Sequence, residues 1–285
     1  MKISPTDTRL NAISMDGLFG VTAAALAKEN GKARNATLDL GSVEFFDPYA
    51  VVSLSVLVEF LVSQTKGTLT IILPGNLNVR SYLRRLRVLE RWQDVASLDG
   101  GAGDSGGSQS DVLLELSRID SKRAIERATE QLLQIVSANL GYKRKSINAL
   151  TNTISELCFN VLDHSEGAGW AVAQRYRRSN GSRFLWIGVA DGGVGIKKSL
   201  GSRYDTSKWS HFDAIVNALK KNFSRFTKRG LGLHMVKRIV FDFGGSLHIR
   251  TGDCRLYLAA KPQGIQGSLF PGTQVGISLS EQSGA

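Results

Sequence analysis

Three polar side chains in the second half of the sequence follow one another at intervals of four residues. They are Glu156, Asn160 and His164, and on an α-helix residues four apart lie roughly 40° apart around the axis. The stripe would offer a carboxylate to orient water, an amide oxygen for Mg²⁺, which prefers oxygen ligands, and an imidazole. Taken alone, a Glu and an Asn at this spacing are more often solvated surface residues, so the pattern needs partners elsewhere in the chain.

Two glycine-rich segments follow, and at each the main chain could approach a nucleotide closely. The first runs from Asp191 through Gly193 and Gly195 to Ile196, and its carboxylate could accept a hydrogen bond from an exocyclic amine such as that of adenine. The second, Gly230-Leu231-Gly232-Leu233, precedes an apolar helix whose N-terminal amides could hold phosphates. Either segment alone could be an ordinary glycine turn or helix start.

The elements that must position these segments alternate between helices and strands. Leu150, Ile154 and Leu157 recur at helical spacing, so residues 145–163 predict an amphipathic helix with the polar stripe at its edge. The other elements expected after residue 111 are helices at 121–140, 213–221 and 231–241 and strands at 170–176, 184–190, 246–250, 255–260 and 273–279. This order predicts a two-layer α/β sandwich, with a mixed sheet, helices on one of its faces and a basic lid over the site.

A smaller α/β domain is expected before them. Its elements are strands at 36–41 and 68–74 and helices at 49–64 and 79–92. Strands that alternate with helices favour some parallel pairing. The Gly- and Ser-rich residues 99–111 then predict a flexible linker. The expected domains are therefore residues 1–98 and 112–285, with the linker between them.

The composition is that of an ordinary chain with enough residues for two cores. It has 285 residues, of which 42% are hydrophobic and 21% charged. The best apolar run, residues 50–60, is too short to span a bilayer, and the N-terminus lacks the apolar stretch of a signal peptide. Two cysteines, Cys158 and Cys254, make neither a zinc site nor a disulfide framework. We therefore expect a cytoplasmic protein without a membrane partner.

The positive charge is concentrated in one part of the chain. The net charge of +11 arises wholly from residues 111–285, with 25 Lys and Arg against 14 Asp and Glu, because residues 1–110 have 11 of each kind. Residues 197–229 alone have nine basic residues against Asp205 and Asp213. A basic segment beside a triphosphate site fits a phosphate-binding lid, although the same charge could contact nucleic acid or an acidic protein.

Together, the three segments resemble the motifs of the GHKL ATPase superfamily, which includes gyrase-type and Hsp90-type ATPases, MutL, histidine kinases and anti-sigma-factor kinases. Residues 156–164 resemble the N box, residues 191–195 the G1 box (D-x-G-x-G) and residues 230–233 the G2 box. Residues 223–226 resemble the F box of histidine kinases, and residues 271–273 the final strand motif. The resemblance covers about residues 115–280 and implies a Bergerat fold that binds ATP and Mg²⁺.

The resemblance also implies a role for each matching residue. Glu156 would be catalytic, orienting the attacking water or substrate hydroxyl, and Asn160 would bind the metal. Asp191 would bind the adenine amine, with Thr273 close to the base. The other implied nucleotide-binding positions are the N-box His164, Gly193 and Gly195 on the base and ribose side, the adjacent Ile196, Lys228 or Arg229 as the lid cation on the terminal phosphate, and Gly230, Leu231, Gly232 and Leu233 near the phosphates.

The first domain resembles a STAS domain, the fold of anti-sigma-factor antagonists. The resemblance lies in residues 38–47, the apolar helix after them and the strand at 68–74. Those antagonists usually carry a phosphorylatable serine just after the aspartate, whereas here Asp47 is followed by Pro48 and Tyr49. The resemblance therefore does not extend to a phosphorylation switch at that point.

The implied function is that of an ATP-binding regulator of the anti-sigma-factor serine/threonine kinase type. It would transfer the terminal phosphate to a protein or to water, and nucleotide would alter its contacts with a protein partner. A classical histidine kinase is not expected, because none of the four histidines lies on a dimerisation helix upstream of residue 156. The alternative is a nucleotide-gated interaction module or clamp without significant kinase activity, whose basic lid could contact nucleic acid. A homodimer is a further option.

Overall fold

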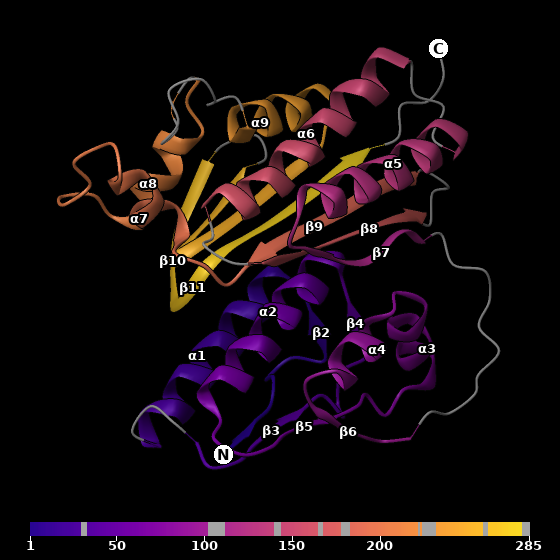
Figure 1. The fold of residues 1–285 in the computed structure, drawn as a ribbon, viewed down its shortest axis with the longest axis vertical. Helices are drawn as coiled ribbons and strands as arrows, with labels where there is room; N and C mark the ends of the chain where they lie inside the picture. The colour runs from indigo at the N-terminus through magenta and orange to yellow at the C-terminus, as the bar shows by residue number, and fades with distance from the viewer. Residues whose placement is uncertain are drawn as a thin grey trace.

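The computed structural model describes residues 1–29, 33–101, 112–139, 144–164, 168–177, 183–221, 223, 232–258 and 262–280. These residues form a four-stranded sheet, a five-stranded sheet and a short two-stranded pair, with helices packed against them (Figure 1). The predicted fold class, a small α/β unit followed by an α/β sandwich, is confirmed. No helix in the described part of the chain is long and apolar enough to cross a membrane.

The N-terminal region, residues 1–101, is built around a parallel sheet in the order β1-β3-β5-β6. Its strands are β1 (Lys2–Ile3), β3 (Ala36–Asp39), β5 (Leu69–Ile72) and β6 (Ser97–Asp99), and a separate pair joins β2 (Arg9–Leu10) to β4 (Phe45–Phe46). The predicted strands at 36–41 and 68–74 are confirmed. β6 ends at the first residue of the predicted linker, and residues 102–111 lie outside the described residues.

In the described residues four helices accompany this sheet, and only α2 matches the prediction. They are α1 (Ala12–Lys28), α2 (Pro48–Gln64), α3 (Leu77–Arg85) and α4 (Val88–Gln93). The single helix predicted over 79–92 is wrong, because Arg87 has a φ of 58° and a left-handed residue cannot continue a helix. α1 has no counterpart in the predicted elements. It begins with a reciprocal cap between Asn11 and Ser14, whereas the capping boxes that are easily found in a sequence have Glu or Gln at that third position.

α2 is a core helix that is buried on all sides. Asp47 caps its N-terminus by accepting a hydrogen bond of 2.7 Å from the Ala50 amide, and Pro48 occupies the first helical position. Every residue from Pro48 to Val58 is buried. A helix that is apolar all round needs neighbours all round, and α2 packs against α1 and α4 as well as against the second sheet. The helix predicted at 49–64 is thus confirmed.

The C-terminal region contains a sheet in the order β10-β11-β9-β8-β7, in which every described strand pair is antiparallel. Its strands are β7 (Val112–Ile119), β8 (Gly169–Arg177), β9 (Arg183–Asp191), β10 (Ser246–Leu258) and β11 (Pro262–Ser280). The predicted mixed sheet is wrong, because all four described pairs are antiparallel; β8 with β9 and β10 with β11 are pairs of strands that follow each other directly in the chain, which favours this pairing. The strands predicted at 246–250 and 255–260 are one continuous strand, and β7 is not among the predicted elements.

The side chains of this sheet alternate between two cores. Ala171 and Ala173 belong to a core with the helices of one face, whereas Trp170 and Val172 belong to a core with α1 and α2. This alternation follows from the two-residue period of a strand. Figure 1 shows the two sets of helices on opposite sides of the sheet. The predicted cover on one face is confirmed, and the N-terminal region covers the other face, which the sequence does not predict.

The remaining helices lie on or beside the first of these faces. α5 (Lys122–Asn139), α6 (Arg144–His164) and α9 (Gly232–Asp242) cover it, and α7 (Gly195–Gly201) and α8 (His211–Ala218) lie near one end of β10 (Figure 1). The helices predicted at 121–140, 145–163, 213–221 and 231–241 are confirmed, and α7 is additional. The face with α5, α6 and α9 carries the polar stripe of α6 and the start of α9.

Candidate functional site

α6 presents the predicted polar stripe at the edge of a buried apolar face. Leu150, Ile154 and Leu157 are all buried in the first core, as the helical period requires. Glu156 and Asn160 are half-buried beside this face. His164 is the last residue of α6, and its side chain lies outside the described residues. The helix thus holds a carboxylate and an amide one turn apart at the border between core and solvent.

The second glycine segment meets this helix at Asn160. A Cβ atom at Gly232 would lie 3.0 Å from Nδ2 and 3.5 Å from Oδ1 of Asn160. Only glycine leaves the Asn160 amide its present position, since a side chain at 232 would press on it. α9 begins at Gly232. The N-terminus of this helix therefore lies beside Asn160, whose amide oxygen is of a type that binds metal ions. Leu233, the next residue, packs against the first core.

Asp191 is a buried carboxylate at the end of β9. Its side chain accepts a 2.8 Å hydrogen bond from the Gly193 amide, and its backbone pairs with Thr273 on β11. Burial raises the pKa of Asp191 to about 7, and hydrogen bonds from the amides of Gly193 and Thr273 oppose this only in part. A carboxylate in this position gains from any further donor that approaches it. The amine of a purine base is such a donor.

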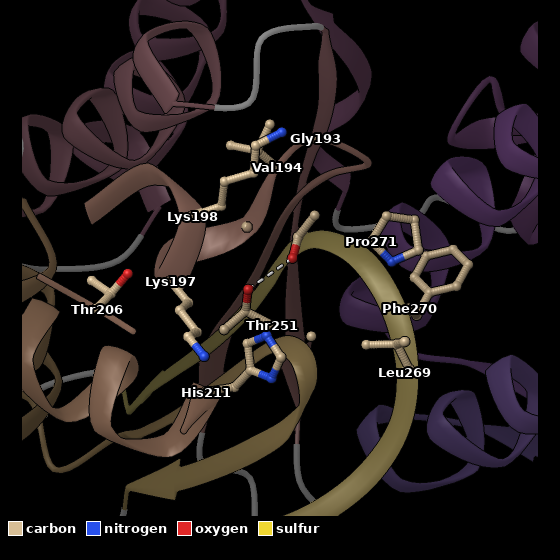
Figure 2. Close-up of a pocket in the computed structure, with 13 residues that line it drawn as sticks. Gly193, Val194, Lys197, Lys198, Thr206, His211, Thr251, Leu269, Phe270 and Pro271 are labelled. Carbon is tan, nitrogen blue, oxygen red and sulfur yellow. Dashed lines mark hydrogen bonds between the residues drawn. The ribbon is translucent and has the colours of Figure 1, made fainter. Parts of the chain in front are cut away.

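The turn after Asp191 is fastened by two buried residues that the motifs do not include. Gly195 has a φ of +75°, and the Ile196 amide donates to Thr251 Oγ1 at 3.1 Å. The Thr251 hydroxyl in turn donates to the Gly272 carbonyl at 3.0 Å, the dashed line of Figure 2. Gln274 Nε2 donates to the Asp191 carbonyl at 3.0 Å. The sequence signal for Thr251 and Gln274 is a polar residue inside an apolar strand, which strand periodicity alone does not distinguish from an outward-facing one.

A cavity of about 580 Å³ opens at this turn. Lys197, His211 and Thr251 lie along one part of its wall, and Leu269, Phe270 and Pro271 lie along another (Figure 2). Glu156, Asn160 and Asp191 are not among the described residues that line it. Gly193 and Gly195 do line it, so the cavity shares the turn after Asp191 with the candidate site, whereas Glu156 and Asn160 of α6 lie outside its lining.

Several predicted site residues cannot be placed. Lys228, Arg229, Gly230 and Leu231 lie outside the described residues, as do residues 224–226 of the segment that resembles an F box. The first residue of that segment, Phe223, stacks on Tyr204 at 4.2 Å between ring centroids. The described part of the site therefore consists of α6, the Asp191–Ile196 turn, the start of α9 and Thr273.

These residues fit a nucleotide with a bound divalent cation. The amide oxygen of Asn160 is a ligand type that Mg²⁺ accepts, and Mg²⁺ needs few protein ligands when phosphate oxygens and water supply the rest. In the described residues no group of three or more His, Cys, Asp or Glu could hold a metal ion. The buried Asp191 offers an acceptor for a base, and Gly195 and Gly232 leave room where a Cβ would strike Thr251 or Asn160.

Comparison with known proteins gives a match over the same part of the chain. Residues 145–282 match the family model described as "Histidine kinase-, DNA gyrase B-, and HSP90-like ATPase". The solved structure of a mycobacterial sensor histidine kinase, MprB, is similar over 57% of this chain and 97% of its own chain, with 18% sequence identity and a TM-score of 0.26. No curated protein matches the chain.

Proposed function

We propose that the chain is a cytoplasmic, ATP- and Mg²⁺-binding regulatory protein, because residues 145–282 match the model of the histidine kinase-, DNA gyrase B- and HSP90-like ATPase family. We assign it to the anti-sigma-factor serine/threonine kinase type. It transfers the terminal phosphate to a protein or to water and signals through nucleotide-dependent partner binding. The observation that carries the proposal is the meeting of Asn160 with Gly232, because it joins two separate motifs into one site.

In this proposal Asp191 selects the base. Its ionised carboxylate accepts a hydrogen bond from the adenine amine, with Thr273 beside it on the neighbouring strand. The raised pKa of Asp191 supports this role, because a buried carboxylate is stabilised by each donor it gains. Gly193 and Gly195 allow the main chain to approach the base and ribose.

Asn160 and Glu156 serve the phosphate end. Asn160 would hold Mg²⁺ through its amide oxygen, and a bound Mg²⁺ would supply positive charge against the phosphates. Glu156, one turn earlier on α6, orients the attacking water or hydroxyl. Phosphoryl transfer depends chiefly on positioning and electrostatics, and a rigid helix packed on a sheet suits that demand. Lys228 or Arg229 is proposed as the cation on the terminal phosphate.

The N-terminal region is proposed as a STAS-like regulatory domain, residues 1–98, joined by the linker at 99–111 to the ATPase part, residues 112–285. Its parallel sheet and the helix that follows Asp47 support this assignment. Position 48 is proline, so regulation by phosphorylation at that point is not part of the proposal. A protein partner, either a separate STAS-type regulator or a second copy of the chain, would respond to the nucleotide state.

The test is a single-turnover experiment with ATP labelled on its terminal phosphate. The full-length protein and Mg²⁺ are incubated with and without candidate partner proteins, and the label is followed to protein, free phosphate or unreacted ATP. We expect Glu156→Gln to lower transfer at least about a hundredfold, within the range for loss of a positioned acid–base group. The matched control is Glu126→Gln, an exposed residue on the neighbouring helix α5. Equal rates for wild type and Glu156→Gln would remove the catalytic assignment.

A second candidate is a nucleotide-gated clamp without significant turnover. The observation that favours it is the positive charge of residues 197–229, from which Lys197 and Lys198 line the cavity beside the turn. DNA binding that weakens steeply with salt, together with ATP binding but no release of phosphate, would favour the clamp over the kinase.

A further inference from the structure

Arg250 is a buried cation that joins the two regions of the chain. It lies on β10 with 1% of its surface exposed, and its Nε donates to Asp16 Oδ1 on α1 at 3.1 Å. Nη1 donates to the carbonyl of Phe270 at 3.4 Å, and Nη2 to that of Ser268. The Ser268 amide also donates to Asp16 at 3.3 Å. A guanidinium can be buried only when its donors are paired, and here the N-terminal region supplies the charged partner.

Aromatic rings hold the guanidinium in this position. Phe19 of α1 stacks on Phe270 of β11, with ring centroids 3.9 Å apart. The Arg250 guanidinium carbon lies 4.5 Å from the Phe19 centroid and 5.6 Å from the Phe270 centroid. Cation–π contacts of this kind are strongest where water is excluded. The orientation of Arg250 therefore depends on α1 through both Asp16 and Phe19.

Arg250 in turn fixes the side chain of Gln274. Nη1 donates to Gln274 Oε1 at 3.3 Å, and Gln274 Nε2 donates to the Asp191 carbonyl at 3.0 Å. A guanidinium has donors and no acceptor, so the oxygen of the Gln274 amide must face Arg250. The NH₂ group must then face Asp191. The buried ion pair thus fixes the orientation of the Gln274 amide, whose NH₂ group then donates to the main-chain carbonyl of Asp191, the proposed base-binding residue.

We propose that the N-terminal region positions the base-binding carboxylate through the relay of Asp16, Arg250 and Gln274, which ends on the Asp191 carbonyl. These three are positioning residues, and Asp191 is the residue that they position. The inference rests on the proposed function, since it concerns adenine recognition by Asp191. It makes docking of α1 on the sheet a determinant of nucleotide choice, so that the first region regulates the second within one chain.

A second contact between the regions provides a matched control. Glu59 on α2 forms an ion pair with Arg118 on β7, with 2.5 Å between oxygen and nitrogen. β7 is an edge strand, and β8 separates it from β9, which ends in Asp191. Asp16→Asn and Glu59→Gln each remove one carboxylate charge from a contact between the regions. Only the first substitution touches the relay.

The experiment compares the affinity of the full chain for ATP and for inosine triphosphate, which carries a carbonyl oxygen in place of the amine. Wild type is expected to prefer ATP, and Asp191→Asn to lose that preference. Asp16→Asn is expected to weaken ATP about tenfold while inosine triphosphate changes less than about twofold, because only the contact to the amine is misplaced. Glu59→Gln is expected to leave both affinities unchanged.

Gln274→Glu gives the same measurement if Asp16→Asn does not fold. It retains an acceptor for Arg250 but puts an oxygen against the Asp191 carbonyl, so ATP alone should weaken. Unchanged preference in both variants, or an equal loss for both nucleotides, overturns the relay and leaves the proposed function intact. If Asp191→Asn itself keeps the wild-type preference, the adenine assignment fails and the relay falls with it.

Discussion

The two faces of the five-stranded sheet are built on opposite principles. On the face with α5, α6 and α9, the polar residues of the candidate site, Glu156 and Asn160, are half-buried at the margin of the core. On the face with α1 and α2, the covering surface is apolar, and the ion pair of Arg250 with Asp16 is buried within it. The first arrangement leaves polar atoms where a ligand can reach them. The second satisfies them inside the protein, which makes it a fixed surface for docking.

The largest effect on the face with α1 and α2 is expected from removing its buried cation, Arg250. We expect Arg250→Met to lower the free energy of unfolding by about 3–5 kcal/mol, because the buried Asp16 carboxylate then keeps only Arg255, 3.8 Å away, as a charged partner. Urea denaturation of the full chain measures this. Arg118→Gln should cost less than about 1 kcal/mol, because Arg118 is 46% exposed in its pair with Glu59.

Arg250→Met also tests whether the two regions unfold together. The second core mixes side chains of both, such as Leu54 from α2 and Val172 from β8, so we expect a single unfolding transition. Two separate transitions, with Arg250→Met shifting only one of them, would show that the second face is a loose contact rather than a shared core.

A smaller test concerns the close approach of α2 to the sheet. A Cβ at Gly188 on β9 would lie 2.4 Å from the Pro48 carbonyl oxygen. Gly188→Ala should therefore force α2 away and cost about 1–3 kcal/mol, as overpacking does. Gly17→Ala is the matched control, because a Cβ at this exposed position in α1 would meet nothing closer than 4.0 Å. That change should stabilise the helix by up to about 1 kcal/mol. Thermal melting of the two variants should move in opposite directions.

The same comparison explains what the sequence could and could not predict. The face with α5, α6 and α9 could be predicted, because α6 has a clear apolar period and because each motif spans only a few residues of the chain. The face covered by α1 and α2, called the docking face here, could not be predicted. Arg250 and Gln274 lie in strands, where a polar residue normally indicates a side chain that points to solvent. The partner Asp16 is far away in sequence, on a helix whose Asn11–Ser14 cap has no Glu or Gln. Arg250 and Gln274 are buried because they contact residues far away in the sequence, and no local sequence pattern predicts such contacts.

On the face with α5, α6 and α9, the contact between Gly232 and Asn160 allows a test of Asn160 as the Mg²⁺ ligand. We expect Gly232→Ala to weaken Mg²⁺-dependent ATP binding about tenfold, or about 1.4 kcal/mol, because the added Cβ would lie 3.0 Å from Nδ2 of Asn160. Titration of the full chain with ATP, with and without Mg²⁺, measures it. The control is Gly201→Ala on α7, where the neighbour at 3.0 Å is Thr206 instead. A similar loss in the control, or a loss without Mg²⁺ as large as with it, would count against Asn160 as the metal ligand.

The smallest expected effect is a pH dependence of base recognition. Burial raises the pKa of Asp191 to about 7, and the carboxylate accepts the adenine amine only when ionised. The ionised fraction rises about threefold between pH 6.5 and 7.5, so ATP affinity should rise about threefold over that interval. Inosine triphosphate corrects for titration of the triphosphate itself, and Asp191→Asn should give a flat ratio of the two affinities.

Without nucleotide, the same carboxylate should act on stability in the opposite direction. The folded chain keeps its proton up to about pH 7, whereas the unfolded chain loses it near the ordinary value of 3.8. Between these values the folded state binds more protons, so this group lowers the free energy of unfolding as pH rises.

Burial raises the pKa of Asp47 on the docking face to about 7 as well, and no ligand is proposed there. Saturating ATP should thus flatten the stability slope from Asp191 and leave that from Asp47, which Asp47→Asn removes while keeping a capping side chain. An ATP effect of equal size in Asp191→Asn would contradict the assignment of the base to Asp191.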